Sequence, residues 1–115
     1  MMINGNITAT FQVKSSKKNI IGEKMLTWKN KLNILGWLDY ASGSNELSKY
    51  NAKVQESTHI FLCDYDVKLN EINAENSRCV INDNIYQVLM IDNPMQMNEH
   101  CEIYLKYVGG GLSVG

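Results

Sequence analysis

Several residue types are scarce in this sequence, and each scarcity narrows the structural class of the protein. Proline occurs once, at Pro94, and arginine once, at Arg78. No apolar run approaches the roughly 20 residues that cross a bilayer as a helix. The N-terminus has no cationic stretch followed by a long apolar one, so it is not typical of a secretory signal. We therefore expect a soluble chain that is made in the cytoplasm and does not contact a membrane.

A surplus of basic charge is also missing. The 115 residues hold 11 lysines and arginines against 12 aspartates and glutamates, which gives a formal net charge of -1. Proteins that bind nucleic acid through its phosphates alone rely on such a surplus. We therefore expect contact with DNA only through geometry, such as a pore, or through a local patch. The length suits one domain with one core.

Cysteine is present in a number that fits no common framework. Cys63, Cys79 and Cys101 are three, widely spaced, and form no C-x-x-C pair. This pattern argues against a disulfide scaffold and a zinc knuckle, and it favours a reduced intracellular setting. We expect all three to be small buried side chains.

The residues that could bind a metal or carry out catalysis are poorly placed for either task. On one strand, His59 and Cys63 would share a face but lie about 13 Å apart, too far for one ion. His100 and Cys101 would point to opposite faces. Residues 64–66 begin like a calcium loop but lack the glycine and the glutamate that complete one. We expect no metal, no cofactor and no catalytic residue; a small enzyme centred on one of the histidines is the weaker alternative.

The dominant hydrophobic period is two, which is typical of strands with one buried face. Ile7, Ala9, Phe11 and Val13, for example, alternate with polar residues. Repetition of this pattern at short spacing predicts a mainly β fold, a small antiparallel β-barrel of about six or seven strands. The expected strands are residues 7–13, 25–40, 58–63, 78–82, 85–92 and 100–108.

Turn-forming residues separate these strands. Residues 14–22, rich in lysine, serine, asparagine and glycine, predict a loop. Asp83 and Asn84 predict a tight hairpin turn. Gly36, inside the second strand, predicts a bulge or a bend.

One connection is longer than the others. Residues 42–57 are polar and nearly balanced in charge, and a short helix is expected around 44–54. Long connections in compact domains are usually functional or disordered, so this segment is a candidate functional element. We expect a single barrel domain at 1–108 and a flexible glycine-rich tail at 109–115.

The single proline predicts a rigid corner. Pro94 fixes its own φ and holds Asn93 extended, so the strand before it must stop there. Met95 and Met97 follow, and they are either fillers at a barrel end or an exposed patch; we favour the filler interpretation because exposed apolar patches are the less common case.

The two tryptophans are expected to be anchors, because large aromatic side chains most often lie in cores and interfaces. Trp37 lies inside an alternating strand and is expected in the core or at a subunit contact. Trp28 is expected to cover a barrel end.

Four stretches, taken in order, resemble one family. They are "LTWKN" (26–30), "LGWLDYASGSNEL" (35–47), "ESTHIFLCDYD" (56–66) and "RCVINDNIYQVLMIDNPMQMNEHCEIYLKYV" (78–108). This succession is similar to the head–tail adaptor, or head-closure, family of long-tailed bacteriophages and related defective prophage elements. The similarity covers residues 26–108 and depends on the order and spacing of the motifs.

The resemblance implies a non-enzymatic function. Several copies would form a ring below the portal vertex, join the capsid to the tail and close the DNA channel after packaging. The implied partners are the portal protein, a tail or tail-completion protein, further copies of the chain, and packaged DNA within the channel only. The implied location is the head–tail interface of the virion, after synthesis in the host cytoplasm.

Candidate residues follow from combining this resemblance with the sequence pattern. The polar segment 42–57 is the candidate channel-facing gate, and a mobile or protruding apolar residue is a candidate contact with a subunit or the portal. The gate candidates are Ser44, Glu46, Lys49, Lys53 and Glu56. The contact candidates are Trp28, Met95, Met97 and Leu112. The alternative is a monomeric β-barrel binding module, an adaptor with no role in retaining DNA.

Overall fold

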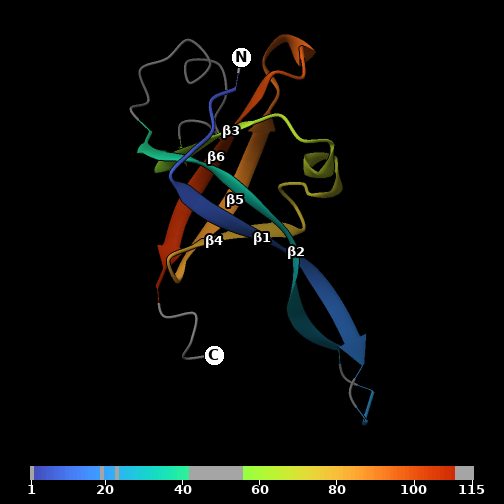
Figure 1. Cartoon of the computed structure of the whole chain (residues 1–115). Helices are drawn as coiled ribbons and strands as arrows, with labels where there is room; N and C mark the ends of the chain where they lie inside the picture. Colours follow the sequence, from blue (N-terminus) through green and yellow to red (C-terminus); the bar gives the residue numbers. More distant parts are fainter. Residues whose placement is uncertain (1, 19, 23, 42–55, 111–115) are drawn as a thin grey trace.

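The protein is a closed six-stranded antiparallel β-barrel (Figure 1). This computed structural model describes residues 2–18, 20–22, 24–41 and 56–110. Around the barrel the strand order is β1-β2-β3-β6-β5-β4. The strands are β1 (Ile7–Lys18), β2 (Lys24–Tyr40), β3 (His59–Asp64), β4 (Ser77–Ile81), β5 (Asn84–Asp92) and β6 (His100–Gly109), with 3-10 turns η1 (Val67–Glu71) and η2 (Pro94–Gln96). The predicted mainly β barrel is confirmed.

Alternating side chains fill the barrel, as the period of two predicts. Phe11 of β1 and Phe61 of β3 meet edge to face near its centre, with ring centroids 6.2 Å apart. Cys63, Cys79 and Cys101 are buried and free, which confirms the prediction for all three. The core cluster consists of Ala9, Phe11, Leu32, Ile34, Phe61, Cys63, Leu69, Ile72, Cys79, Ile81, Tyr86, Val88, Cys101, Ile103 and Leu105.

The first hairpin is longer than the sequence pattern predicts. The loop predicted at 14–22 is wrong over its first five residues, because β1 continues to Lys18 and pairs with β2 down to Lys18↔Lys24. Those residues, KSSKK, show no apolar alternation, so the sequence gives no period of two from which a strand could be predicted. We call residues 14–31 the hairpin arm. It leaves the barrel in Figure 1 and contributes to a longest dimension of 50 Å.

Of the two alternatives predicted at Gly36, a bulge or a bend, the bulge is wrong. Gly36 pairs regularly with Ile7 on one side and Cys63 on the other, whereas the register shifts between Phe11 and Gln12. There Phe11 pairs with Leu32 and Gln12 with Asn30, so Lys31 is the extra residue and the arm begins at a bulge.

Gly36 is required instead for close packing. The N-terminal segment crosses β2 there, and a Cβ on Gly5 would lie 2.3 Å from the Gly36 Cα. A Cβ on Gly36 would lie 2.4 Å from the Leu62 carbonyl oxygen and 2.5 Å from the Phe61 ring. The Asn6 amide donates to the Gly36 carbonyl at 3.0 Å, which fixes the crossing.

Two turns set the register of the last three strands. Asn82 and Asp83 have φ values of 49° and 66°, the two left-handed residues of a tight hairpin turn. The predicted turn is therefore displaced by one residue. β5 ends at Asp92, and Asn93 is extended before Pro94, so the predicted strand stop at the proline is confirmed.

The remaining predictions concern Trp37, the helix around 44–54 and membrane-spanning segments. Trp37 is 43% exposed, so of its two predicted places the core is wrong, and the subunit contact stays a prediction. The helix expected around 44–54 lies outside the described residues, as do residues 111–115 of the expected tail. In the part of the chain that the structure describes, no helix is long and apolar enough to cross a membrane.

The packing at Gly36 generates a stability prediction. Gly36→Ala should lower the free energy of unfolding by about 1–3 kcal/mol, because the new methyl group overpacks against backbone and an aromatic ring. Gly109→Ala is the matched control, since no atom lies within 4 Å of the added Cβ. It should change stability by less than about 0.5 kcal/mol. Urea denaturation followed by circular dichroism measures both; equal stability of the two variants would contradict the packing argument.

Candidate functional site

A cationic and aromatic cluster lies at the base of the hairpin arm. Trp28 pairs across the hairpin with Lys14, and Arg78 of β4 pairs with Gln12 of β1. The Arg78 guanidinium lies 4.4 Å from the Trp28 ring centroid and the Lys14 ammonium 5.7 Å from it. Gln12 accepts a hydrogen bond from Arg78 Nε at 2.7 Å, which fixes the guanidinium over the ring. Trp28 is thus a half-buried structural anchor of the arm, bound by cations of its own chain.

The corner that follows β5 exposes its two methionines. Met95 is 88% exposed and Met97 is 58% exposed, so the filler interpretation is wrong. Asn93 Nδ2 donates to Asn98 Oδ1 at 2.7 Å, and the Asn98 amide donates back to Asn93 Oδ1 at 3.1 Å. These bonds close the turn beyond the barrel end, where no described strand or turn covers the methionines. The exposed pair is an available contact surface.

The same corner concentrates negative charge. Asp92 of β5 and Glu102 of β6 are direct cross-strand partners, and like charges in that position destabilise a sheet. Glu102 accepts from the Tyr104 hydroxyl at 2.9 Å and lies 3.4 Å from His100 Nε2. Burial and then the Glu102 charge raise the pKa of Asp92, while His100 opposes the shift. The corner therefore holds two carboxylates that repel each other.

The N-terminal segment is held at this end of the barrel. Backbone amides of Ile3 and Asn4 donate to the two Asp64 carboxylate oxygens at 2.6 and 2.9 Å. The Trp37 indole donates to the Ile3 carbonyl at 2.8 Å, which is why this tryptophan lies on the surface. Nothing local in the sequence signals this contact, because its partners lie about sixty residues apart.

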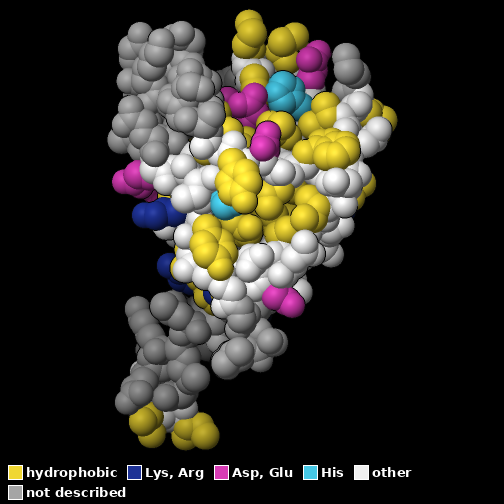
Figure 2. Space-filling view, turned by 90° about the vertical axis from the view of Figure 1, so that its left-hand side faces the viewer, with side chains coloured by type: hydrophobic (Ala, Val, Ile, Leu, Met, Phe, Trp, Pro, Cys, Tyr) yellow, Lys and Arg dark blue, Asp and Glu magenta, His cyan; other side chains and the backbone are white. Residues whose placement is uncertain are grey.

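A row of rings crosses one face of the barrel, where Figure 2 shows hydrophobic side chains around a histidine. Centroid distances are 4.9 Å for Tyr40–His59, 5.1 Å for His59–Tyr86 and 5.6 Å for Tyr86–Tyr107. Burial lowers the pKa of His59, and the Thr58 hydroxyl lies 2.8 Å from its Nδ1. Tyr86 belongs to the core, whereas Tyr40 and Tyr107 at the two ends of the row are exposed and provide contact area for a partner.

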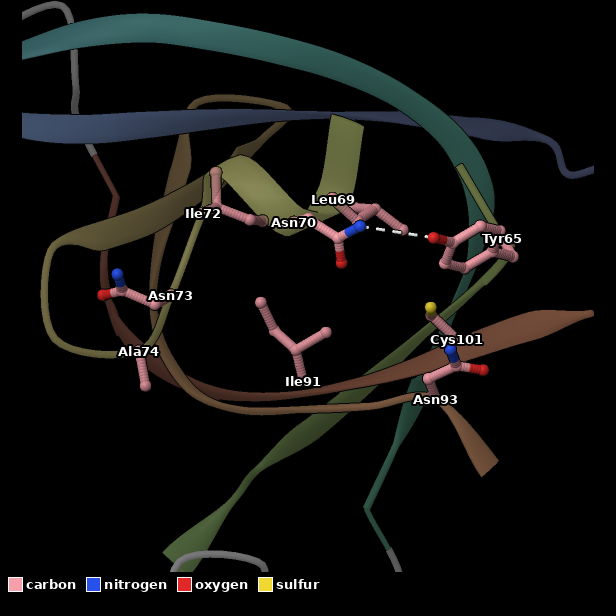
Figure 3. A pocket seen from close by; sticks show the side chains of 9 residues that line it. All are labelled: Tyr65, Leu69, Asn70, Ile72, Asn73, Ala74, Ile91, Asn93 and Cys101. Carbon is pink, nitrogen blue, oxygen red and sulfur yellow. Dashed lines mark hydrogen bonds between the residues drawn. The ribbon is translucent and has the colours of Figure 1, made fainter. Parts of the chain in front are cut away.

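A cavity of about 350 Å³ opens at one end of the barrel, beneath η1 (Figure 3). Ile91 and Cys101 point into it, and the Asn70 side-chain amide donates to the Tyr65 hydroxyl at 3.3 Å on its rim. Burial and then the Asp92 charge raise the pKa of the Cys101 thiol. A thiol kept protonated is a weak nucleophile, so the cavity suits packing more than covalent chemistry.

Most of the gate candidates lie in the part of the chain that the structure does not describe. Ser44, Glu46, Lys49 and Lys53 lie outside the described residues, and so does Leu112 among the contact candidates. Glu56 is exposed just before β3 and lines a pocket with Glu75 and Gln87. Within the described ranges, no three histidine, cysteine or acidic side chains gather as metal ligands.

Comparison with known proteins shows a fold and no family. No protein-family model matches the chain, and no curated protein matches it. Among solved structures it is similar to the solution structure of protein SF1141 from Shigella flexneri 2a, with a TM-score of 0.70 and 17% identity. The similarity covers 91% of this chain and 94% of that chain. At this identity the likeness shows the fold alone.

The carboxylate pair at the corner generates a pH prediction. Because the pKa of Asp92 is higher in the folded than in the unfolded chain, its charged form opposes folding. The free energy of unfolding therefore falls as the pH rises from the unfolded pKa through the folded one. Asp92→Asn should therefore be more stable than the natural chain at pH 7, and the difference should vanish below the unfolded pKa of about 3.9. Thermal unfolding across pH measures this. Glu99→Gln, the same charge change at an exposed position of the corner, should show a smaller gain; equal gains would contradict the local cause.

Proposed function

We propose that the protein is a structural head-closure subunit of a long-tailed phage or a related prophage. In this role several copies form a ring that joins the portal of the capsid to the tail and closes the DNA channel. The order of sequence motifs over residues 26–108 supports this role. The barrel is compatible with it, because a rigid closed sheet can present loops and arms to neighbours without changing shape.

The hairpin arm is the observation that carries the proposal. None of its described side chains belongs to the core cluster, although its two strands stay paired from Lys14↔Trp28 to Lys18↔Lys24. Ordering a two-stranded extension costs conformational entropy, and two strands alone bury little apolar surface in return. Such an extension is best explained by a contact with another molecule, which a subunit in a ring would supply on both sides.

A monomeric binding module is the second candidate, and the aromatic row favours it. Tyr40, beside His59, and Tyr107, beside Tyr86, are exposed, and such rings commonly anchor a peptide or protein partner. The two candidates differ in what they bind. A head-closure subunit binds assembled portal rings in stoichiometric amounts, whereas an independent adaptor does not.

Removal of the gene from the parent phage or prophage tests the proposal. We expect DNA-filled heads without tails, or heads that lose DNA, because the channel would lack its closing ring. Electron microscopy and a nuclease-protection assay of packaged DNA measure the two effects. Normal tailed particles would contradict the proposal.

A shortened variant provides a sharper second arm of this experiment. Replacing residues 16–26 by Asn-Gly would join the paired residues Ser15 and Thr27 through a tight turn and leave the barrel intact. This variant should fold but fail to restore tailed particles, whereas the natural gene restores them. Circular dichroism confirms folding, so a failure to complement would not reflect an unfolded chain.

A further inference from the structure

Charge is divided unevenly between the hairpin arm and the rest of the chain. The arm, residues 14–31, carries six lysines and one glutamate, whereas the remaining residues carry five basic and eleven acidic side chains. The net charge of -1 is therefore the sum of about +5 on the arm and about -6 on the remaining residues. Surfaces of opposite charge on one molecule can steer two copies together.

The arm ends in a basic and apolar tip. Lys18 and Lys24 are direct cross-strand partners in the last pair of the hairpin. Ile20, fully exposed, and Ile21, 77% exposed, lie between them in the turn. The tip therefore combines two lysine positions in register with two exposed isoleucines.

The acidic corner, residues 92–102, has the complementary character. It contains three carboxylates and neither lysine nor arginine, and two of those carboxylates, Asp92 and Glu102, face each other across β5 and β6. Met95 and Met97 are exposed within the same stretch. Figure 2 shows this mixture of acidic and hydrophobic side chains at the top of the molecule, and hydrophobic side chains at the far tip.

These two surfaces match in two independent properties. Each has two residues of like charge in register across two strands, lysines in the arm and carboxylates in the corner, and each exposes two large apolar side chains. The pairs of charges would neutralise each other, and the isoleucines would cover the methionines. The surfaces lie at opposite ends of the molecule in Figure 1, so one copy cannot join them by itself.

We propose that the tip of the hairpin arm of one copy docks on the acidic corner of a second copy. The contact is heterologous: each subunit uses its arm on one neighbour and its corner on the other. Repeated from subunit to subunit, this contact would build the proposed ring. Only the closure of that ring rests on the proposed function. The contact itself needs no phage component.

Reciprocal charge reversal tests the contact on the purified full-length chain. The arm variant is Lys18→Glu with Lys24→Glu, and the corner variant is Asp92→Lys with Glu99→Lys. Each variant alone places like charges on both surfaces, so each should associate roughly tenfold more weakly than the natural chain or worse. A mixture of the two variants in equal amounts should regain association, because arm and corner are then opposite in sign in both directions.

Sedimentation velocity and native mass spectrometry measure association at about 0.05 M and about 0.5 M salt, where screening differs strongly. The natural chain should associate at the lower salt and separate at the higher. The control variant, Lys68→Glu with Lys106→Glu, has the same net charge as the arm variant but alters exposed lysines outside the arm. It should associate like the natural chain. Thermal unfolding shows that each variant is folded.

Three results would overturn the proposal. The first is a natural chain that stays monomeric at about 1 mM in low salt. The second is a mixture of reversed variants that associates no better than either alone. The third is an arm that binds duplex DNA while reversal of the corner leaves self-association unchanged, which would assign the arm to DNA. None of these results depends on particle assembly, so the contact and the head-closure function can fail separately.

Discussion

The short ladder between β1 and β4 is the constraint on which the rest of the structure depends. Four residue pairs, from Thr10↔Val80 to Val13↔Ser77, close the sheet into a barrel. Closure removes both sheet edges and encloses the core, which a flat sheet of this size could not do. Because β1 is twelve residues long and closure uses only part of it, the remainder must leave the barrel with β2 as the hairpin arm.

The same constraint concentrates the unusual features at the two ends. At one end lie the crossing at Gly36, the carboxylate of Asp64 that binds the N-terminal amides, and the acidic corner. At the other end Trp28 and its cations stiffen the base of the arm. The middle is an apolar interior with no buried side-chain polar atom left unsatisfied among the described residues. The polar and charged features that could contact another molecule therefore lie at the two ends, and the apolar packing that stabilises the barrel lies between them.

The sequence predicts the barrel well where one strand face is buried. Residues 7–13 alternate clearly because their inward side chains pack on the core, and Pro94 marks the end of the apolar stretch 85–92. It predicts the arm badly, because Lys14, Ser15 and the residues after them are polar and leave no hydrophobic period to detect. The bulge predicted at Gly36 is wrong for a related reason. A glycine in a strand indicates either a bulge or the close approach of another chain segment, and the sequence alone does not distinguish the two.

The contact surfaces could be predicted only in part. Net charge by segment is visible in the sequence, but the opposition of Lys18 to Lys24 and of Asp92 to Glu102 depends on register. The exposure of Met95 depends on a turn closed by two asparagines, which local pattern does not specify. The mainly β barrel predicted from the sequence agrees with the closed barrel, whereas membership of the head-closure family stays a proposal.

The hairpin arm also behaves as a spacer of adjustable length. Because β1 and β2 pair antiparallel beyond the barrel, one residue pair can be added or removed without touching any core position. A change of two pairs moves the tip by about 7 Å and keeps every side chain on its original face. The reach of the tip can therefore be changed by insertions confined to this hairpin, while the packing of the barrel stays the same.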